Sequence, residues 1–354
     1  MKKNTRRLLS TASGAAMLLA GCASNATVEQ PSVQEEASVQ NDYGITVTEA
    51  KTIEYAKVAN VGGSFEFNQD VVSPSDEVFS IFGTALTGLC AAPSYALENN
   101  KGTATMYVNV KGDIRKAYSI DIKELAGEGK ETTRISLCAC STGPASATGK
   151  ITGVKLEDVI QMADFNDGVN AIKVVGSDGY GQVLPLSYAL EKEALIVYKI
   201  NGMDVPSSTQ FWIPETVAKY FTRDVVDIEL LATDDVPSVD ARADEYRAQI
   251  NILNSAENAA IALGDTVTFE GYADDLGEPI AAIEFSMDGG ETWTSYPTDN
   301  ATTESWVYWY FNYTPKEIGT YRLTARAVTA AGTVSPLEST VTFTVSELAG
   351  GEIA

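Results

Sequence analysis

A change in the spacing of apolar residues near residue 248 divides the chain into two unlike parts. From about Ala248 to Val345, short segments alternate apolar and polar residues with a period of two, as strands with one buried face do. Turn signals such as Asp288-Gly-Gly290 separate these segments. The pattern predicts an all-β sandwich of the immunoglobulin-like type, which must hold together without a disulfide because no cysteine falls in this range. The expected strands are 266–272, 283–287, 306–310, 321–327 and 340–345, with Trp293, Trp306 and Trp309 in the core.

The part before this sandwich mixes strand-like and helix-like patterns. Residues 107–112 and 172–175 resemble strands, whereas residues 154–160, preceded by Gly153, have the apolar spacing of a helix. The mixture predicts an α+β domain, and the total of 354 residues fits two domains. The expected division is an α+β domain at 43–235, a polar linker at 236–247, a sandwich domain at 248–347 and a tail at 348–354.

The first 22 residues have the order of a bacterial secretory signal. Basic residues precede an apolar run at 8–20, and Leu19-Ala-Gly-Cys22 has the form of a lipobox. The run is shorter than the ~20 residues that a membrane-spanning helix needs. We therefore expect a signal peptide at 1–21, lipid attachment at Cys22 and a flexible acidic tether over 22–42. Arg6-Arg7 also resembles a twin-arginine export signal. The expected location is extracytoplasmic, with a lipid anchor as the only membrane contact.

The sequence contains no histidine. This excludes Ser-His-Asp and Cys-His nucleophile systems, HExxH zinc sites, and haem or copper sites held by histidine. The formal net charge of −23 argues against binding to nucleic acid, whose phosphates such a surface repels. Any chemistry must therefore use cysteine, carboxylate, tyrosine, lysine or arginine side chains, or a cofactor.

The four cysteines leave more than one interpretation open. With Cys22 lipidated, three remain, and three thiols cannot all pair within one exported chain. Cys90 could form a disulfide with Cys138 or Cys140, or all three could be buried apolar side chains. Alternatively, one thiolate holds a soft or redox-active metal, because Cys138 and Cys140 lie where a strand runs into a loop. Zinc is the second-choice metal, since Asp or Glu would have to replace His, and the four-cysteine spacing of an iron–sulfur cluster is absent.

Several stretches resemble the sulfite oxidase superfamily of molybdopterin enzymes. A strand ending in cysteine precedes a stretch similar to the family's W-x-G-V-x-L-x-D pattern, and later stretches are similar to its "DGY..PL", "LLAY" and "NGEPLP" segments in the same order. The sandwich resembles the family's C-terminal dimerisation domain. The stretches concerned are 151–160, 177–186, 194–198, 201–206 and 211–229 in the first domain, and 283–293, 306–309 and 321–327 in the second.

The resemblance implies a sulfite-oxidase-like molybdopterin-binding domain with a molybdenum–molybdopterin cofactor (Moco) held by one protein thiolate. It also implies two-electron oxygen-atom transfer on a small sulfite- or sulfoxide-like substrate. Cys140 or Cys138 is the expected ligand; the two share one strand face, and Cys140 is preferred because it is nearer the loop. Tyr180 is expected to line the pocket and donate a hydrogen bond to a substrate oxygen. The residues expected to bind the cofactor are Arg134, Lys150, Asp178, Lys219 and Arg223.

Departures from the family's pattern keep a second hypothesis open. Ser141 and Thr142 stand where family members often have Asn and Arg, and the usual His residues are missing. The alternative is a cofactor-free homologue that acts as a cell-surface binding or structural lipoprotein. The enzyme hypothesis also requires a separate electron-transfer partner, because no haem-binding segment is present. The family's use of its C-terminal domain implies a homodimer.

Overall fold

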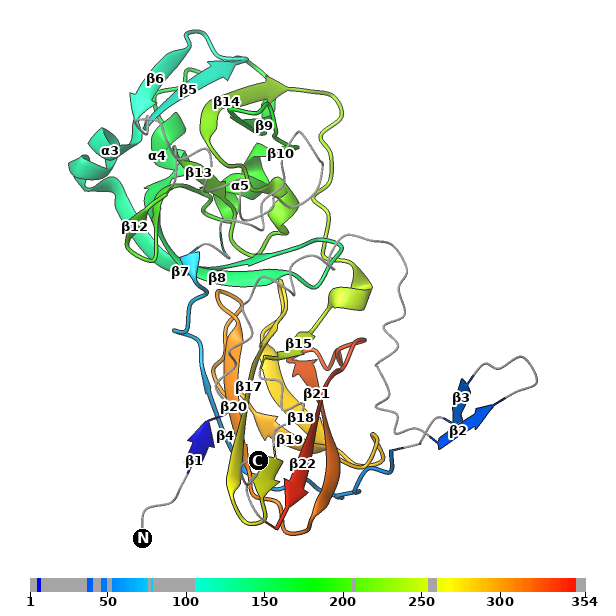
Figure 1. Ribbon diagram of the computed structural model, residues 1–354. Coiled ribbons are helices and arrows are strands. Elements are labelled where there is room, and N and C mark those ends of the chain that lie inside the picture. Colours follow the sequence, from blue (N-terminus) through cyan, green and yellow to red (C-terminus); the bar gives the residue numbers. More distant parts are fainter. Residues whose placement is uncertain are drawn as a thin grey trace.

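The computed structural model describes residues 5–7, 37–40, 46–49, 53–75, 78, 106–205, 208–253 and 260–347. Within these ranges the chain forms an α+β domain and a β-sandwich, drawn one above the other in Figure 1. The predicted order of an α+β domain followed by a sandwich is confirmed. The expected lipidation site Cys22, the third cysteine Cys90 and the tail at 348–354 lie outside the described residues. In the described part of the chain, no helix is both long and apolar enough to cross a membrane.

The α+β domain contains two five-stranded sheets. The first has the order β10-β9-β14-β5-β6, and the only parallel pair among these strands is β14 with β5. Its strands are β5 (Tyr107–Gly112), β6 (Tyr118–Asp121), β9 (Val169–Gly176), β10 (Val183–Pro185) and β14 (Val225–Ala232). The expected strands at 107–112 and 172–175 are both present here.

The second sheet has the order β12-β11-β8-β7, with β13 also paired to β11. Its strands are β7 (Glu131–Ala139), β8 (Ser146–Lys155), β11 (Leu195–Ile200), β12 (Met203–Asp204) and β13 (Gln210–Trp212). Strands β7 and β8 form a long antiparallel hairpin. The hairpin matters because β7 delivers the two predicted ligand cysteines to its end.

Short helices connect these sheets and cover the core. They are α3 (Ile122–Leu125), η1 (Ala126–Lys130), α4 (Leu156–Ile160), α5 (Leu186–Glu191), η2 (Ala218–Tyr220) and η3 (Asp244–Tyr246). The helix predicted at 154–160 begins only at Leu156, because Val154 and Lys155 still pair with β11. Gly153 is not a helix signal: a Cβ there would lie 2.2 Å from the carbonyl oxygen of Ile196, so it permits close approach of β8 and β11.

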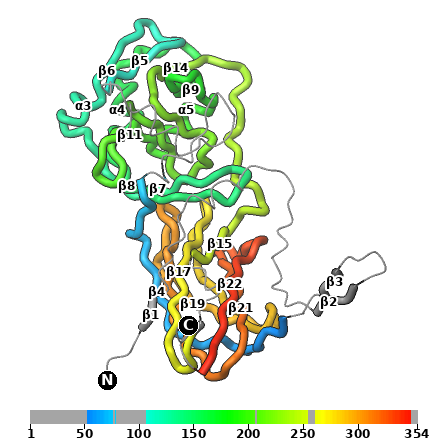
Figure 2. The backbone as a smooth tube through the Cα atoms, viewed as in Figure 1, coloured from blue at the N-terminus to red at the C-terminus, as the bar shows by residue number. Residues whose placement is uncertain are grey.

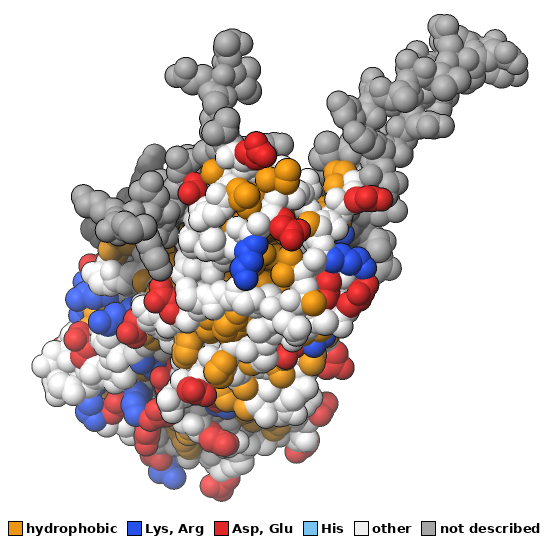
Figure 3. Space-filling view, turned by 90° about the horizontal axis from the view of Figure 1, so that it is seen from below, with side chains coloured by type: hydrophobic (Ala, Val, Ile, Leu, Met, Phe, Trp, Pro, Cys, Tyr) orange, Lys and Arg blue, Asp and Glu red, His pale blue; other side chains and the backbone are white. Residues whose placement is uncertain are grey.

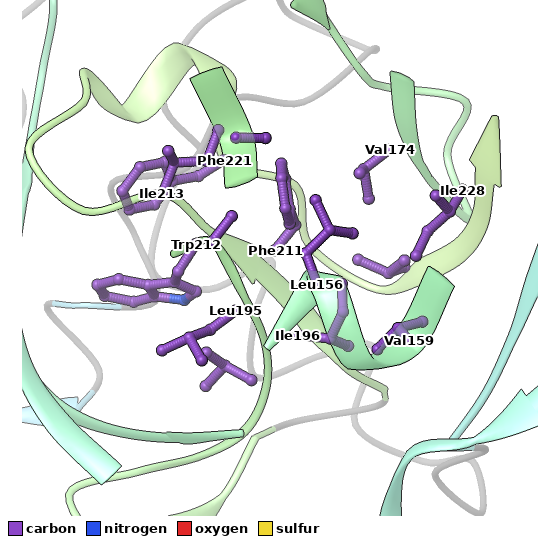
Figure 4. Close-up of a cluster of buried hydrophobic side chains, with 14 of the residues drawn as sticks. Leu156, Val159, Val174, Leu195, Ile196, Phe211, Trp212, Ile213, Phe221 and Ile228 are labelled. Atoms are coloured by element: carbon purple, nitrogen blue, oxygen red, sulfur yellow. The ribbon is translucent and has the colours of Figure 1, made fainter. Parts of the chain in front are cut away.

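The core of the α+β domain lies between its two sheets. Leu156 and Val159 of α4 pack among side chains from strands of both sheets (Figure 4). Trp212 and Phe221 contribute the large rings, whose centroids are 5.1 Å apart. Such a continuous apolar cluster is what fixes the two sheets relative to each other.

The sandwich is built from two further sheets, β1-β17-β20-β4 with β15 on β17, and β16-β22-β21-β18-β19. Its central strands alternate buried and half-buried residues, as the sequence predicts, and Phe285 stacks on Phe311 at 4.3 Å in the core. Figure 3 looks at the far end of the sandwich, where acidic side chains are interspersed with apolar ones. The strands are β1 (Thr5–Arg7), β4 (Ser64–Asn68), β15 (Gln249–Ile252), β16 (Ala260–Ala262), β17 (Thr266–Asp274), β18 (Ile280–Ser286), β19 (Thr294–Pro297), β20 (Val307–Tyr313), β21 (Gly319–Thr329) and β22 (Ser339–Ser346). Strands β2 (Ala37–Gln40) and β3 (Thr46–Glu49) pair only with each other.

The segment at 53–68 lies on the sandwich and not on the α+β domain. Strand β4 pairs antiparallel with β20, with Phe65 opposite Phe311 and Phe67 opposite Trp309. The tube in Figure 2 shows this segment running alongside the sandwich before the chain reaches the upper domain. The expected first domain at 43–235 therefore differs from the structure at its beginning. The reason is that β4 completes the edge of the aromatic β20 strand, a long-range pairing that local pattern does not reveal.

The three tryptophans expected in the sandwich core have different surroundings. Trp309 is fully buried in that core. Trp306 lies at the boundary of the two domains, against Leu137 and Ala139 of β7, and is 5% exposed. Trp293 is only half-buried, with the guanidinium of Arg326 over its ring at 3.9 Å.

Candidate functional site

Cys138 and Cys140 lie at the end of β7, which separates the two domains. Leu137 and Ala139 point to the sandwich and pack on Trp306, whereas Cys138 belongs to the core of the α+β domain. Because side chains alternate along a strand, Cys140 follows on the same face as Cys138. Cys138 is fully buried and Cys140 half-buried, and no disulfide joins them. Burial, with a smaller effect from Cys140, raises the pKa of the Cys138 thiol well above its usual value.

The loop after Cys140 is held by residues from outside its own hairpin. The backbone N–H of Cys140 donates to the carbonyl of Ala145 at 2.8 Å and closes the loop at 140–145. The carbonyl of Ser141 accepts from the N–H of Ala243 at 2.8 Å, and the carbonyl of Pro144 accepts from the side chain of Gln249. The segment expected to be a polar linker thus packs directly against the cysteine loop.

A second loop reaches the same end of β7. Ala139 forms a parallel β-bridge with Val217, the residue before η2, so Lys219 and Tyr220 lie close to the cysteines. The Nζ of Lys219 forms an ion pair with Asp240, and this hydrogen bond raises the pKa of the lysine. Lys219 therefore places a positive charge near the end of β7 at which Cys138 and Cys140 lie, called the cysteine end below. In this structure Asp240 balances that charge.

The turn between β9 and β10 is the third segment at this place. The carboxylate of Asp178 accepts a hydrogen bond from the N–H of Tyr180 at 2.9 Å, which shapes the turn. The hydroxyl of Tyr180 donates to the carbonyl of Lys219 at 2.6 Å. A Cβ on Gly176 would lie 2.5 Å from the carbonyl of Arg223, so only glycine lets the turn pack on this neighbouring segment. Asp178, Tyr180, Lys219 and Arg223 are thus brought together.

Arg134 and Lys150 lie elsewhere. Arg134 precedes Cys140 by six positions in an extended strand, a separation of about 20 Å at the usual rise per residue. Its guanidinium forms ion pairs with Glu304 at 2.8 Å and Glu193 at 3.7 Å, beside a pocket of about 210 Å³ between the domains. Lys150 is exposed in β8, opposite Ile135. The structure does not bring these two cations to the cysteine end.

The side chains at the cysteine end offer few metal donors, so they suit a metal whose other ligands come from an organic cofactor. Across the described residues, no group of three or more Cys, Asp or Glu side chains is arranged to hold a metal ion. A structural zinc site would need four protein ligands. A molybdenum bound by a pterin dithiolene needs one soft thiolate from the protein, and Cys138 and Cys140 are side chains of that type at the end of β7. The residues therefore fit the cofactor that the sequence predicts.

Three residues at this place were not foreseen from the sequence. Arg242, Gln249 and Asp274 form a buried polar cluster directly beside the cysteine loop. The only signal for them was the presence of an arginine within a segment that was otherwise typical of a linker. Local pattern does not reveal which distant carboxylate such an arginine will meet.

Comparisons with known proteins agree with this description. Residues 97–233 match the family model of the oxidoreductase molybdopterin binding domain. The sulfane dehydrogenase SoxCD from Paracoccus pantotrophus has a similar structure, with a TM-score of 0.54 and 16% identity over 66% of this chain and 70% of that one. At this identity the likeness shows the fold. No curated protein sequence matches the chain significantly.

Two smaller domains are matched much more weakly. One is the CARDB domain of a Pyrococcus furiosus protein, with a TM-score of 0.22 and 18% identity over 28% of this chain and 94% of that one. The other is a set of fibronectin(III)-like modules from Clostridium thermocellum, with a TM-score of 0.23 and 9% identity over 62% of this chain and 100% of that one. Scores this low do not indicate a shared fold.

Proposed function

Residues 97–233 match the family model of the oxidoreductase molybdopterin binding domain, and on this premise we propose that the chain is an exported molybdopterin-dependent oxidoreductase of the sulfite oxidase type. Its reaction is two-electron oxygen-atom transfer to or from a small oxo substrate of the sulfite or sulfoxide kind. The observation that supports this most directly is the convergence of the Cys140 loop, the Lys219 segment and the Tyr180 turn at one end of β7. All three lie within the matched residues.

Cys140 is the proposed metal ligand. When bound, the cofactor supplies the two-electron redox chemistry at molybdenum. The protein must present a thiolate to it, and Cys140 is half-buried at a strand end, where a cofactor can reach its sulfur. Cys138 is fully buried, and its raised pKa makes the thiolate harder to form.

Lys219 is the proposed partner of the pterin phosphate. A phosphate needs a cation or several N–H donors, and Lys219 follows Val217, which forms a β-bridge with Ala139 beside the cysteines. The cofactor's phosphate would share this lysine with Asp240 or displace it. Arg223 and the Asp178 turn lie on the adjoining segments and complete the proposed binding region.

Tyr180 has a different proposed role from the one that the sequence indicates. Its hydroxyl proton is directed at the carbonyl of Lys219, so the residue ties the two loops of the site together. In this position it orients the Lys219 segment, and it reaches a substrate oxygen only if that hydrogen bond is exchanged.

We also propose that the protein is exported and anchored by a lipid on Cys22. Two sequence features support this proposal: the lipobox at Leu19-Ala-Gly-Cys22 and the pair Arg6-Arg7, which resembles a twin-arginine signal. The twin-arginine pathway exports proteins that fold around a cofactor before they cross the membrane. A separate electron carrier is required, and we propose that two copies associate through the sandwich.

The test is the molybdenum content of the full-length protein, matured in cells that have molybdate and the twin-arginine pathway. Molybdenum by mass spectrometry and pterin by fluorescence after oxidation should both approach one equivalent per chain. Cys140→Ser should lose both, whereas Cys138→Ser and the loop control Ser141→Ala should retain them.

The remaining outcomes discriminate between the alternatives. If Cys138→Ser loses molybdenum and pterin while Cys140→Ser retains them, Cys138 is the metal ligand. Absence of metal and pterin from the unaltered protein under these conditions would contradict the proposal and favour a cofactor-free binding lipoprotein.

A further inference from the structure

Arg242 is buried although it comes from a segment with the composition of a linker. Its side chain is 1% exposed, and that of its partner Asp274, the last residue of β17, is 0% exposed. The Nη1 of Arg242 donates to Asp274. Its Nη2 donates to the hydroxyl of Ser146 at 3.1 Å and to the side-chain carbonyl of Gln249. A guanidinium is sequestered in this way only where several acceptors compensate for its lost hydration.

The acceptors of Arg242 belong to both domains. Ser146 is the first residue of β8, directly after the loop that begins at Cys140. Its hydroxyl donates in turn to Asp274 at 3.2 Å. Gln249 opens β15 of the sandwich sheet and also donates to the carbonyl of Pro144 in that loop. The cluster therefore connects the end of the cysteine loop that leads into β8 to the sandwich.

The beginning of the loop, after Cys140, is held by the segment that contains Arg242. Ala243, the residue after Arg242, donates its N–H to the carbonyl of Ser141 at 2.8 Å. The loop at 140–145 is thus attached at Ser141, Pro144 and the adjoining Ser146, and each attachment goes to Arg242, its neighbour or its partner Gln249. Arg242 makes the bond to Ser146 itself, holds Gln249 through a second bond and precedes Ala243 in the chain.

We propose that Arg242, fixed by Asp274 and Gln249, is a positioning residue that sets the geometry and the exposure of the Cys140 thiol. The sandwich domain thereby acts on a site that lies in the other domain. The relevance to catalysis rests on the proposed function, in which Cys140 is the metal ligand. The positioning itself is a property of the polypeptide and is testable without metal.

The test measures the rate at which Cys140 reacts with iodoacetamide in the folded, full-length protein prepared without molybdate. Digestion with trypsin releases Cys138 and Cys140 in one peptide, 135–150, and fragment ions distinguish which sulfur is labelled. Cys138 is fully buried, so its labelling reports general unfolding and serves as an internal reference.

Arg242→Lys keeps the charge but replaces the two separate Nη donor groups by a single ammonium, so the bonds to Asp274, Ser146 and Gln249 cannot all keep their geometry. Losing charge-assisted hydrogen bonds should increase local opening of the loop, and labelling of Cys140 relative to Cys138 should rise about tenfold. Gln249→Ala removes the attachment at Pro144 while leaving the ion pair in place, and should give a smaller rise. The matched control is Arg247→Lys, since Arg247 comes from the same segment but pairs with Asp275 at 2.8 Å, away from the loop.

Equal labelling ratios in Arg242→Lys, Gln249→Ala and the unaltered protein, with all three folded, would overturn the proposal. If Arg242→Lys fails to fold, Gln249→Ala decides alone. A protein that contains no molybdenum but shows the expected labelling would refute the proposed function and leave this inference standing. Normal molybdenum content in the unaltered protein, with labelling that does not change in the variants, would support the proposed function and refute the positioning role of Arg242.

Discussion

The hydroxyl of Tyr180 donates a hydrogen bond to the backbone carbonyl of Lys219 across 2.6 Å. This contact joins the turn between β9 and β10 to the segment that runs beside the cysteines. The side chain of Lys219 is left to interact with Asp240 from the segment between the domains. Tyr180 thus holds in place the backbone from which the cation of the site projects.

Replacing Tyr180 by phenylalanine should remove this hydrogen bond with little change in packing. A hydrogen bond of this kind contributes about 1 kcal/mol to the free energy of unfolding, and the carbonyl of Lys219 would lose this partner. Urea unfolding of the two proteins measures the difference. Tyr310→Phe in the sandwich is the matched control for removing a hydroxyl remote from this contact. Equal stability of Tyr180→Phe and the unaltered protein would show that the bond does not hold the loop.

Most of the regular structure could be predicted from local sequence pattern. The strand predicted at 107–112 is β5, and all five strands predicted in the sandwich overlap observed ones. Alternation with a period of two is a direct consequence of one buried face, so it identifies strands wherever a core covers one side. Sequence pattern places the segment at 53–68 in the α+β domain, because its true position depends on a strand more than 200 residues away.

The site was predictable only where its residues share a chain segment or a family motif. Cys138 and Cys140 could be placed together from their spacing. Tyr180 and Lys219 meet in the structure, whereas Arg134 and Lys150, for which the sequence offers only their charge, lie along the hairpin away from the cysteines. Arg242 was missed because its burial depends on Asp274, which comes from another domain.

Lys219 should influence how much cofactor the protein retains. If its ammonium meets the pterin phosphate, Lys219→Gln removes a charge-assisted contact of about 1.5 to 3 kcal/mol, and the molybdenum content should fall about tenfold or more under limiting cofactor. Lys150→Gln is the matched control, because Lys150 is an exposed cation of β8 outside the cysteine end. Equal molybdenum content in the two variants would exclude Lys219 as a phosphate ligand.

Asp288 should make the sandwich sensitive to acid. The side chain of Thr292, followed by its backbone N–H and by Ser286, donates hydrogen bonds that lower the pKa of Asp288 to about 2. An acid with a lowered pKa in the folded state stabilises the fold above its unfolded pKa and loses that effect as pH falls through the folded value. The stabilisation is therefore present at pH 5 and is lost between about pH 4 and pH 2.

The measurement is the melting temperature of the unaltered protein and of Asp288→Asn across this pH range. The asparagine variant should melt at a lower temperature at pH 5, and the difference should shrink towards pH 2. Asp70→Asn, at an exposed position outside this turn, controls for the general effect of removing one negative charge. A difference that stays constant with pH would show that the Asp288 carboxylate is not the titrating group.

Trp306 should be the side chain whose loss most weakens the contact between the domains. It packs on Leu137 and Ala139, stacks on Tyr272 at 4.5 Å and donates its indole N–H to the carbonyl of Val71 at 2.7 Å. Trp306→Ala should lower the free energy of unfolding by about 3 to 5 kcal/mol, the usual cost of emptying such a site.

The position of the cavity also predicts how Trp306→Ala unfolds. The cavity left by Trp306→Ala lies between the domains, so the two domains should no longer stabilise each other and should unfold in separate steps in urea. Fluorescence and circular dichroism both monitor this unfolding. Trp293→Ala removes the same side chain from a half-buried place where the main contact is Arg326, so it should cost about 1 kcal/mol and leave the shape of the transition unchanged. If both variants lose similar stability and keep one transition, the contact through Trp306 does not hold the domains together, and the site at the end of β7 would have to be stabilised within the α+β domain.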